Sequence, residues 1–235
     1  MISIVIPARN EENNIKQTLE KLNSSLKLDC EIIVVNDHST DKTKEVLLSL
    51  QERYKNLIAI DNMNEPGIAS AINTGFEASA GEFVVCMMAD LCDEIKTIEL
   101  MHKKMLEGFD MVCGSRYMKG GRRLGGSKLK AFFSSFVGKS LKILTGIPTH
   151  DTPNAFKMYK KSLLSEVKTG SKGFEMSVEL ALKAYFAGYK ISEVPTTWHE
   201  RTEGQSHFKI AKLGPKYLKW YLWGIAKGIQ KCFIR

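Results

Sequence analysis

The sequence has 235 residues, of which 43% are hydrophobic and 26% charged, with 34 Lys and Arg against 26 Asp and Glu. This composition excludes a disordered, collagen-like or polytopic membrane chain, and the length fits one large domain or one domain with an appendage. The formal net charge of +8 suggests an anionic partner: a nucleic acid, a membrane surface or a phosphorylated substrate.

The first half of the chain alternates short β-branched runs with helical patterns. Strands are predicted at residues 2–6, 31–35, 57–60, 82–88 and 110–113. Helices are predicted at residues 13–26, 41–50, 68–78 and 95–107. Asp41 is expected to cap the second helix. This βαβα series predicts an α/β fold with right-handed crossovers.

The second half opens with residues 115–130, which read as a flexible basic loop rich in glycine. The elements expected after it are a helix, a polar turn, a second helix and a late strand, at residues 129–144, 151–157, 173–188 and 191–194. A long final helix is predicted from about Lys209 or Pro215. The pattern therefore favours one domain at residues 1–208, followed by a helical extension at 209–235.

Cysteine usage and the N-terminus favour a reducing compartment. Five cysteines with no CxxC pair argue against a disulfide framework and against a zinc ribbon. The apolar run at residues 1–6 is too short for a signal-peptide core, so a cytoplasmic protein is expected.

The positive charge is concentrated in two segments without acidic residues. Residues 111–150 carry eight cations and residues 204–235 carry seven, so the rest of the chain has 19 cations against 26 acids and a net charge of −7. The alternative for either segment alone is an ordinary solvated surface.

Polar residues follow four of the predicted strands, at the sheet edge where α/β proteins bind their ligands. These segments are residues 7–12, 36–41, 89–93 and 114–117. Asp37 is placed to accept hydrogen bonds from a ribose or base, with a helix cap or turn as an equal alternative. Asp90 ends an apolar strand, where a divalent cation bridging to a diphosphate would offset the cost of an unpaired carboxylate. Arg116 could hold a phosphate through two hydrogen bonds.

Six motifs in chain order resemble family 2 glycosyltransferases of the GT-A fold. They are IPARNEE, VVNDHSTDKT, CMMADL, GSRYMKGG, DTPNAFKMY and WHERTEGQSHF. The last is similar to the F-x-x-R-x-x-G-x-S-K segment of the branch that glycosylates polyprenyl phosphates, typified by dolichyl-phosphate mannose synthase. The resemblance covers about residues 1–210. It implies a Rossmann-like, mostly parallel sheet flanked by helices, here followed by a C-terminal amphipathic helix.

The resemblance also implies roles for the matching residues. The nucleotide sugar would bind at Pro7, Ala8, Arg9, Glu11, Asp37, Gly67, Ala89 and Asp90. The donor and acceptor phosphates would bind at Arg116, Lys128, Lys130, Arg201, Ser206, His207 and Lys209. The implied catalytic residues are Asp90, Arg116, Asp151, Glu175 and Arg201. Asp90 would hold Mg²⁺ or Mn²⁺, and Glu175 is a candidate acid–base group.

Several residues depart from the family pattern. Met88 stands where the first Asp of D-x-D is expected, and Cys92 takes a position often held by a polar ligand, so metal binding is expected to be weaker. Further replacements are Asn36 for Asp, Ala155 for Gly, Lys157 for Arg and His207 for Lys. An inactive homologue therefore stays open as an alternative.

The C-terminal segment combines Trp, Tyr and Lys, which together suit a membrane interface. Its aromatic residues include Tyr217, Trp220, Tyr221 and Trp223. Several lysines interrupt the apolar stretch, so a membrane span is not expected. The alternative is a core helix that packs on the domain. Residues 131–144 could form a second contact with the membrane.

The leading hypothesis is an inverting glycosyltransferase that moves a hexose, such as mannose or glucose, from a GDP- or UDP-linked donor. The acceptor would be a polyprenyl or dolichyl phosphate at the cytosolic face of a membrane. One alternative is transfer to a saccharide or protein hydroxyl, with Asp151 or Glu175 as base. The other is an inactive homologue that binds anionic lipid or nucleic acid. The charge distribution favours a bilayer over nucleic acid, and the oligomeric state stays open.

Overall fold

The computed structural model describes residues 1–200 and 210–233. Seven strands of the described residues form one sheet: β1 Ile2–Ala8, β2 Cys30–Asn36, β3 Leu57–Asp61, β4 Phe83–Cys86, β5 Met111–Ser115, β7 Lys157–Lys160 and β8 Ile191–Pro195. Their order across the sheet is β3-β2-β1-β4-β7-β5-β8. All these strands are parallel to their neighbours except β7, which is antiparallel to β4 and to β5.

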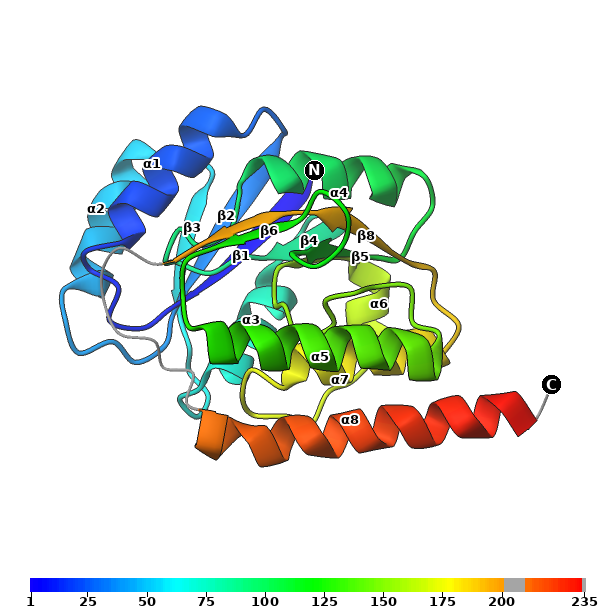
Figure 1. Cartoon of the computed structure of the whole chain (residues 1–235). Coiled ribbons are helices and arrows are strands. Elements are labelled where there is room, and N and C mark those ends of the chain that lie inside the picture. Colours follow the sequence, from blue (N-terminus) through cyan, green and yellow to red (C-terminus); the bar gives the residue numbers. More distant parts are fainter. Residues whose placement is uncertain (201–209, 234–235) are drawn as a thin grey trace.

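Helices cover both faces of this sheet (Figure 1). They are α1 Ile15–Ser25, α2 Thr43–Arg53, α3 Ile68–Ala78, α4 Lys96–Leu106, α5 Lys128–Thr145, α6 Lys161–Glu166, α7 Met176–Phe186 and α8 Ile210–Phe233. Buried side chains of α1, α2 and α4 pack on one face, and those of α3, α6 and α7 on the other, with α5 and α8 outermost. The α/β prediction of a mostly parallel sheet flanked by helices is confirmed.

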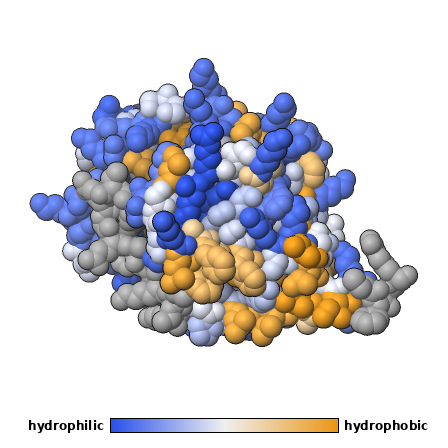
Figure 2. All heavy atoms as spheres, viewed as in Figure 1, coloured by the Kyte–Doolittle hydropathy of each residue, from blue (hydrophilic) through white to orange (hydrophobic). Residues whose placement is uncertain are grey.

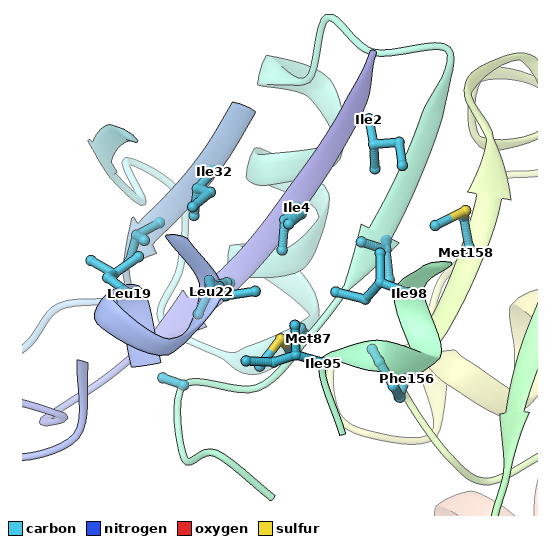
Figure 3. Packing of buried hydrophobic residues seen from close by; sticks show 14 of the residues in the cluster. Ile2, Ile4, Leu19, Leu22, Ile32, Met87, Ile95, Ile98, Phe156 and Met158 are labelled. Atoms are coloured by element: carbon cyan, nitrogen blue, oxygen red, sulfur yellow. The ribbon is translucent and has the colours of Figure 1, made fainter. Parts of the chain in front are cut away.

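The apolar character of the central strands follows from this layering. Every residue of β1 is buried, because a parallel sheet with helices on both faces exposes neither side to water. Side chains alternate between the two faces, so Ile4 and Val5 belong to separate core clusters. Figure 3 shows the first cluster, in which Leu19 and Leu22 of α1 and Ile98 of α4 pack over the strands.

The central strand β7 was not predicted, because its first residue ends a segment that reads as a polar turn. Lys157 pairs with Cys86 on one side and Cys113 on the other, and it is fully buried. Its ammonium group donates hydrogen bonds to the main-chain oxygens of Thr152, at 2.9 Å, and of Asn154. Burial lowers the pKa of Lys157, and these carbonyl acceptors replace the water that the ammonium has lost.

The prediction of a flexible loop over residues 115–130 is wrong in part. Residues Arg122–Leu124 form β6, which pairs in parallel with β9, residues Thr197–His199. The main-chain N–H of His199 also donates to the oxygen of Cys92, at 2.8 Å. This two-stranded ribbon therefore connects the basic segment to the loop that follows β4. The pairing is long-range, so the local glycine and lysine content does not reveal it.

The C-terminal helix α8 packs on α5 and α7 through one side. Trp220 is buried and donates from Nε1 to Ser171 Oγ at 2.8 Å, while Tyr217, Tyr221 and Trp223 lie against the same core. These aromatic rings thus contact the protein body, as expected for the alternative of a helix that packs on the domain, and the membrane-interface role of the segment stays a prediction. No helix of the described residues combines the length and the apolarity needed to cross a membrane.

Candidate active site

A cavity of about 1130 Å³ lies at the carboxyl ends of β1, β2, β4 and β5. The loops after these strands place Arg9, Asp37, Asp90 and Arg116 on its wall. Parallel strands end at the same edge of a sheet, so four segments that are distant in sequence meet at one cavity. The structure therefore brings together the four polar segments singled out in the sequence.

The predicted site residues fall into three groups. Those on the cavity wall are Pro7, Ala8, Arg9, Glu11, Asp37, Gly67, Ala89, Asp90, Arg116 and Lys130. Those off the wall are Lys128, which is exposed, and Asp151 and Glu175, which are buried. Arg201, Ser206, His207 and Lys209 lie outside the described residues. The chemical role of each residue stays a prediction.

Asp37 joins the end of β2 to the start of α3. Its carboxylate accepts from the Gly67 N–H at 3.1 and 3.0 Å and from Asn62 Nδ2 at 2.8 Å. Gly67 has a φ of 155°, which a side chain would strain. Arg9 Nη1 lies 4.0 Å from the Asp37 carboxylate. The wall around Asp37 is thus held by hydrogen bonds, and Asn62 is a supporting residue that sequence reasoning missed.

The prediction that Asp41 is the N-cap of the second helix is wrong by one residue, because Lys42 occupies that position. The helix begins at Thr43, and Asp41 Oδ1 accepts from the Thr43 N–H at 3.0 Å. Asp41 Oδ2 accepts from the N–H of Glu12 at 3.2 Å. The Asp41 side chain therefore bonds to the first residue of α2 and also connects the loops that follow β1 and β2.

The loop after β4 has an unusual backbone. Leu91 has a φ of 57°, a conformation that costs energy for a bulky residue and that occurs often at functional sites. The N–H of Cys92 donates to Asp90 Oδ1 at 3.2 Å. Asp93, which sequence reasoning did not select, is 7% exposed. Burial, and then the charge of Asp90, raises the pKa of Asp93 to about 7.

Arg116 and Asp151 form a buried ion pair beside the cavity. Arg116 Nε donates to Asp151 Oδ2 at 2.7 Å and Nη2 donates to Oδ1 at 2.9 Å, and the Arg116 main-chain N–H adds a third hydrogen bond at 3.0 Å. Arg116 Nη2 also donates to Ser134 Oγ of α5 at 2.9 Å. Burial alone lowers the pKa of Arg116, but the charge and hydrogen bonds of Asp151, together with the nearby Tyr117 and Asp93, outweigh it and raise that pKa. Asp151 therefore orients Arg116 at the wall.

The ribbon of β6 and β9 adds a second cationic group to the cavity. The Arg123 guanidinium lies 4.4 Å from the ring centroid of Trp198, and both residues line the cavity. Glu200 follows Trp198 and accepts from the Gly126 N–H at 2.9 Å. Sequence reasoning did not select Arg123 or Trp198. Trp198 does occupy the F position of the quoted F-x-x-R motif, and that signal could have identified it.

A second part of the cavity lining, which we call the aromatic wall, is mostly aromatic. Its residues come from α5, α8 and the loop before α7: Phe133, Phe136, Val137, Phe174, Tyr217, Leu218 and Tyr221. The sequence indicated apolar patterns in both helices but not that they border the same cavity as the polar strand ends. The cavity lining therefore combines polar and charged strand ends with the aromatic wall, and α5 contributes the polar residues Lys130 and Ser134 to the lining as well.

The donor set around Asp90 does not fit a divalent cation site built by the chain itself. No group of three or more His, Cys, Asp or Glu residues within the described part of the chain could hold a metal ion. Met88 offers a soft thioether, whereas Mg²⁺ and Mn²⁺ take oxygen ligands. Asp90 is thus the one carboxylate of the expected D-x-D motif.

The mostly parallel sheet flanked by helices, with a cavity at the ends of its strands, is a glycosyltransferase fold of the GT-A type. Residues 3–168 match the model of glycosyl transferase family 2, which is most of the chain. The chain belongs to this family.

Proteins with similar sequences include enzymes named for dolichyl phosphates. The chain is 30% identical to a dolichol-phosphate mannosyltransferase of Saccharomyces cerevisiae, over 94% of this chain and 84% of that protein. It is 29% identical to a dolichol-phosphate mannosyltransferase of Pyrococcus furiosus, over 88% of this chain and 59% of that protein. It is also 29% identical to a dolichyl-phosphate beta-glucosyltransferase of Trichomonas vaginalis, over 85% of this chain and 66% of that protein. The chain thus spans less than two thirds of the latter two relatives.

Solved structures of glucosyl-3-phosphoglycerate synthase from Mycobacterium tuberculosis share the fold. The complex with Mn²⁺, UDP and glucosyl-3-phosphoglycerate has a TM-score of 0.72 at 18% identity, over 96% of this chain and 80% of that one. The complex with Mg²⁺ and UDP has a TM-score of 0.72 at 17% identity, over 96% and 79%. At these identities the likeness establishes the fold alone.

Proposed function

We propose that the chain transfers a hexose from a nucleotide-diphosphate sugar to a polyprenyl phosphate, with inversion at the anomeric carbon. The observation that carries this proposal is that one cavity is lined both by polar strand ends and by the aromatic wall. Charged and polar strand ends suit a nucleotide and its phosphates, and an aromatic wall suits an isoprenoid chain. The names of the similar dolichyl-phosphate enzymes support this acceptor class.

In this proposal the nucleoside lies against Pro7, Arg9 and Asp37, where the hydrogen bonds to Gly67 fix the wall. The donor diphosphate and the acceptor phosphate lie near Arg116, Arg123 and Lys130, which line the same cavity. The nucleotide base and the hexose are left open, with GDP and UDP donors both compatible with the proposal.

The reaction forms a bond between an acceptor phosphate oxygen and the anomeric carbon. The bond from that carbon to the donor diphosphate breaks, and the nucleoside diphosphate leaves with the electron pair. Because a phosphate monoester is ionised near neutral pH, the acceptor needs no strong base. The side chains supply positioning and positive charge. The Mg²⁺ or Mn²⁺ predicted at Asp90 is assigned no step.

Transfer to a hydroxyl acceptor is less well supported, because it needs a positioned base. Asp151 accepts three hydrogen bonds from Arg116, and Glu175 is 4% exposed. Both lie off the cavity wall. The two candidate bases are therefore poorly placed to take a proton from a hydroxyl.

The proposal includes docking on the cytosolic face of a membrane. Large apolar side chains are exposed along α5 and α8: Leu129, Phe132, Phe133, Phe136, Ile143, Leu144, Leu218, Leu222 and Ile229. Figure 2 shows apolar surface gathered over these two helices, which run side by side. We call this surface the α5–α8 apolar face. It adjoins the aromatic wall, because Phe133, Phe136 and Leu218 belong to both.

Thermal-shift measurement with a panel of nucleotides and nucleotide sugars tests the donor half of the proposal. A nucleotide that binds the folded chain raises its Tm by mass action. We expect a GDP- or UDP-linked sugar to raise the Tm, with adenosine nucleotides as the matched control. A panel in which no nucleotide shifts the Tm would contradict the proposal.

A further inference from the structure

The cation-binding motif of this chain lacks one of the two carboxylates expected from the family pattern. Met88 and Asp90 both line the cavity, so both motif positions reach the same space. A thioether carries no charge and is a poor ligand for Mg²⁺ or Mn²⁺. Residue 88 therefore contributes nothing to holding a hard cation between the chain and a diphosphate.

Nearby carboxylates do not replace the missing ligand. Asp37 accepts hydrogen bonds from Asn62 and Gly67, Glu11 accepts from Asn14 Nδ2 at 2.6 Å, and Glu200 accepts from Gly126. Asp93 is buried and off the wall. Each of these groups is thus held by the protein's own donors or kept out of the cavity.

The same cavity holds positively charged side chains. Arg123 is partly buried, and its Nε donates to the main-chain oxygen of Gly125 at 3.4 Å. Its cation–π contact with Trp198 leaves the two Nη groups able to donate hydrogen bonds. Lys130 lies in the first turn of α5 and also lines the cavity. Arg116 is oriented at the wall by Asp151. Cationic side chains that line one cavity can neutralise a diphosphate without a metal ion.

We propose that this chain binds the diphosphate of its donor through Arg123 and Lys130, and that a divalent cation adds little to donor affinity. The inference rests on the proposed function, since it concerns the diphosphate of a nucleotide donor. It predicts that the side chain at residue 88 determines whether a divalent cation increases the affinity for the donor. An aspartate at this position would supply the second carboxylate beside Asp90.

Calorimetric titration of the wild-type chain with UDP and GDP, in EDTA and then in excess MgCl₂ or MnCl₂, tests this inference. The Kd of the nucleotide that binds should change by less than about threefold between the two conditions. For Met88→Asp, the cation should lower the Kd by about tenfold or more, which is 1.4 kcal/mol. Met88→Asn adds a neutral polar group of similar size to Asp, and it should respond to the cation as the wild type does.

Variants that each remove one positive charge test whether Arg123 and Lys130 bind the diphosphate. In EDTA, Arg123→Gln and Lys130→Gln should each raise the Kd by about fivefold or more. Arg122→Gln and Lys139→Gln are the matched controls, because Arg122 adjoins Arg123, Lys139 shares α5 with Lys130, and both are exposed and lie off the wall. Equal losses in all four variants would point to general charge attraction and would overturn the assignment.

The wild-type titrations separate the inference from the proposed function. Binding in EDTA supports both. Binding that requires the cation overturns the inference and leaves the proposed function standing. No binding of either nucleotide in any condition overturns the proposed function, and the inference with it. These outcomes depend on no variant, so a Met88→Asp chain that fails to fold does not affect them.

Discussion

Arg116 reaches the cavity because a buried carboxylate holds it there. The side chain of Arg116 is 10% exposed and that of Asp151 is fully buried, so solvent screens their interaction weakly. All three donors that Arg116 gives to Asp151 converge on one carboxylate. At the scale of single residues, Asp151 therefore acts by holding the Arg116 guanidinium in position, and it takes no direct part in the proposed reaction.

Removing the carboxylate should therefore cost stability as well as activity. We expect Asp151→Ala to lower the free energy of unfolding by about 3–5 kcal/mol, because it leaves the Arg116 guanidinium buried and unpaired. Urea denaturation of the variant and the wild type measures this loss. The double variant Arg116→Met with Asp151→Leu should regain part of it. A loss below about 1 kcal/mol in Asp151→Ala would contradict a buried pair.

The raised pKa of Asp93 predicts that the free energy of unfolding depends on pH. Burial, and then the charge of Asp90, raises the pKa of Asp93 from 3.8 to about 7. The folded chain therefore holds this proton more tightly than the unfolded chain, so the stabilisation is complete below the unfolded pKa and is lost as pH rises through about 7.

The variant Asp93→Asn removes this titration. Its Tm relative to the wild type should rise between about pH 5 and about pH 8, by about 2–4 °C for each kcal/mol regained. Scanning calorimetry at several pH values measures the difference. A difference in Tm that stays constant over this range would mean that Asp93 is already ionised in the folded protein.

At the scale of elements, the docking of α8 on α5 depends on a glycine. A Cβ on Gly228 would lie 2.6 Å from the main-chain oxygen of Leu144, which cannot move without the α5 backbone. Gly224 faces the Leu182 side chain instead, with a closest approach of 2.9 Å. The two positions therefore differ in what an added methyl group displaces.

Gly228→Ala should push α8 away from the end of α5, whereas Gly224→Ala should be tolerated by a shift of Leu182. We expect Gly228→Ala to cost about 1–3 kcal/mol, partly offset by the better helix propensity of alanine. Hydrogen exchange of the α8 amides should accelerate in Gly228→Ala more than in Gly224→Ala. Equal exchange in the two variants would mean that α8 is not packed as described.

Elements with strong local patterns were predictable, and those that depend on long-range pairing were not. The helix at Ile68–Ala78 has the predicted bounds, since Pro66 and Gly67 mark its start and its apolar residues recur at helical spacing. The strand at Lys157–Lys160 was missed, because a buried lysine opens it and its partners lie far away in sequence. The ribbon that contains Arg123 and Trp198 was missed for the same reason.

At the scale of the whole molecule, the site residues also divide into those that sequence patterns predict and those that depend on long-range packing. Asp37, Asp90 and Arg116 were predictable, because strand ends of a parallel sheet meet at one edge. The buried state of Asp93 and Asp151 depends on the packing around them, which sequence alone does not specify. The sequence also did not predict that α5 and α8 border the same cavity as the strand ends.

The α5–α8 apolar face predicts binding to anionic lipid vesicles. Lys216, Lys219 and Lys227 are exposed on α8, and apolar contact combined with lysine favours an anionic membrane surface. Phe132→Ser with Leu222→Ser should reduce co-sedimentation with such vesicles by several fold. The matched control is Leu48→Ser with Leu106→Ser, two exposed leucines of α2 and α4. Equal co-sedimentation of the two double variants would contradict docking through this face.

Transfer of a hexose to a polyprenyl phosphate is the central claim, and a direct assay tests it. The purified chain is incubated with GDP-mannose or UDP-glucose and a short polyprenyl phosphate, and mass spectrometry follows the lipid. We predict a lipid heavier by one hexose, and no product from the matched polyprenol that lacks the phosphate. Transfer to the polyprenol or to a saccharide hydroxyl, with none to the polyprenyl phosphate, would contradict the account.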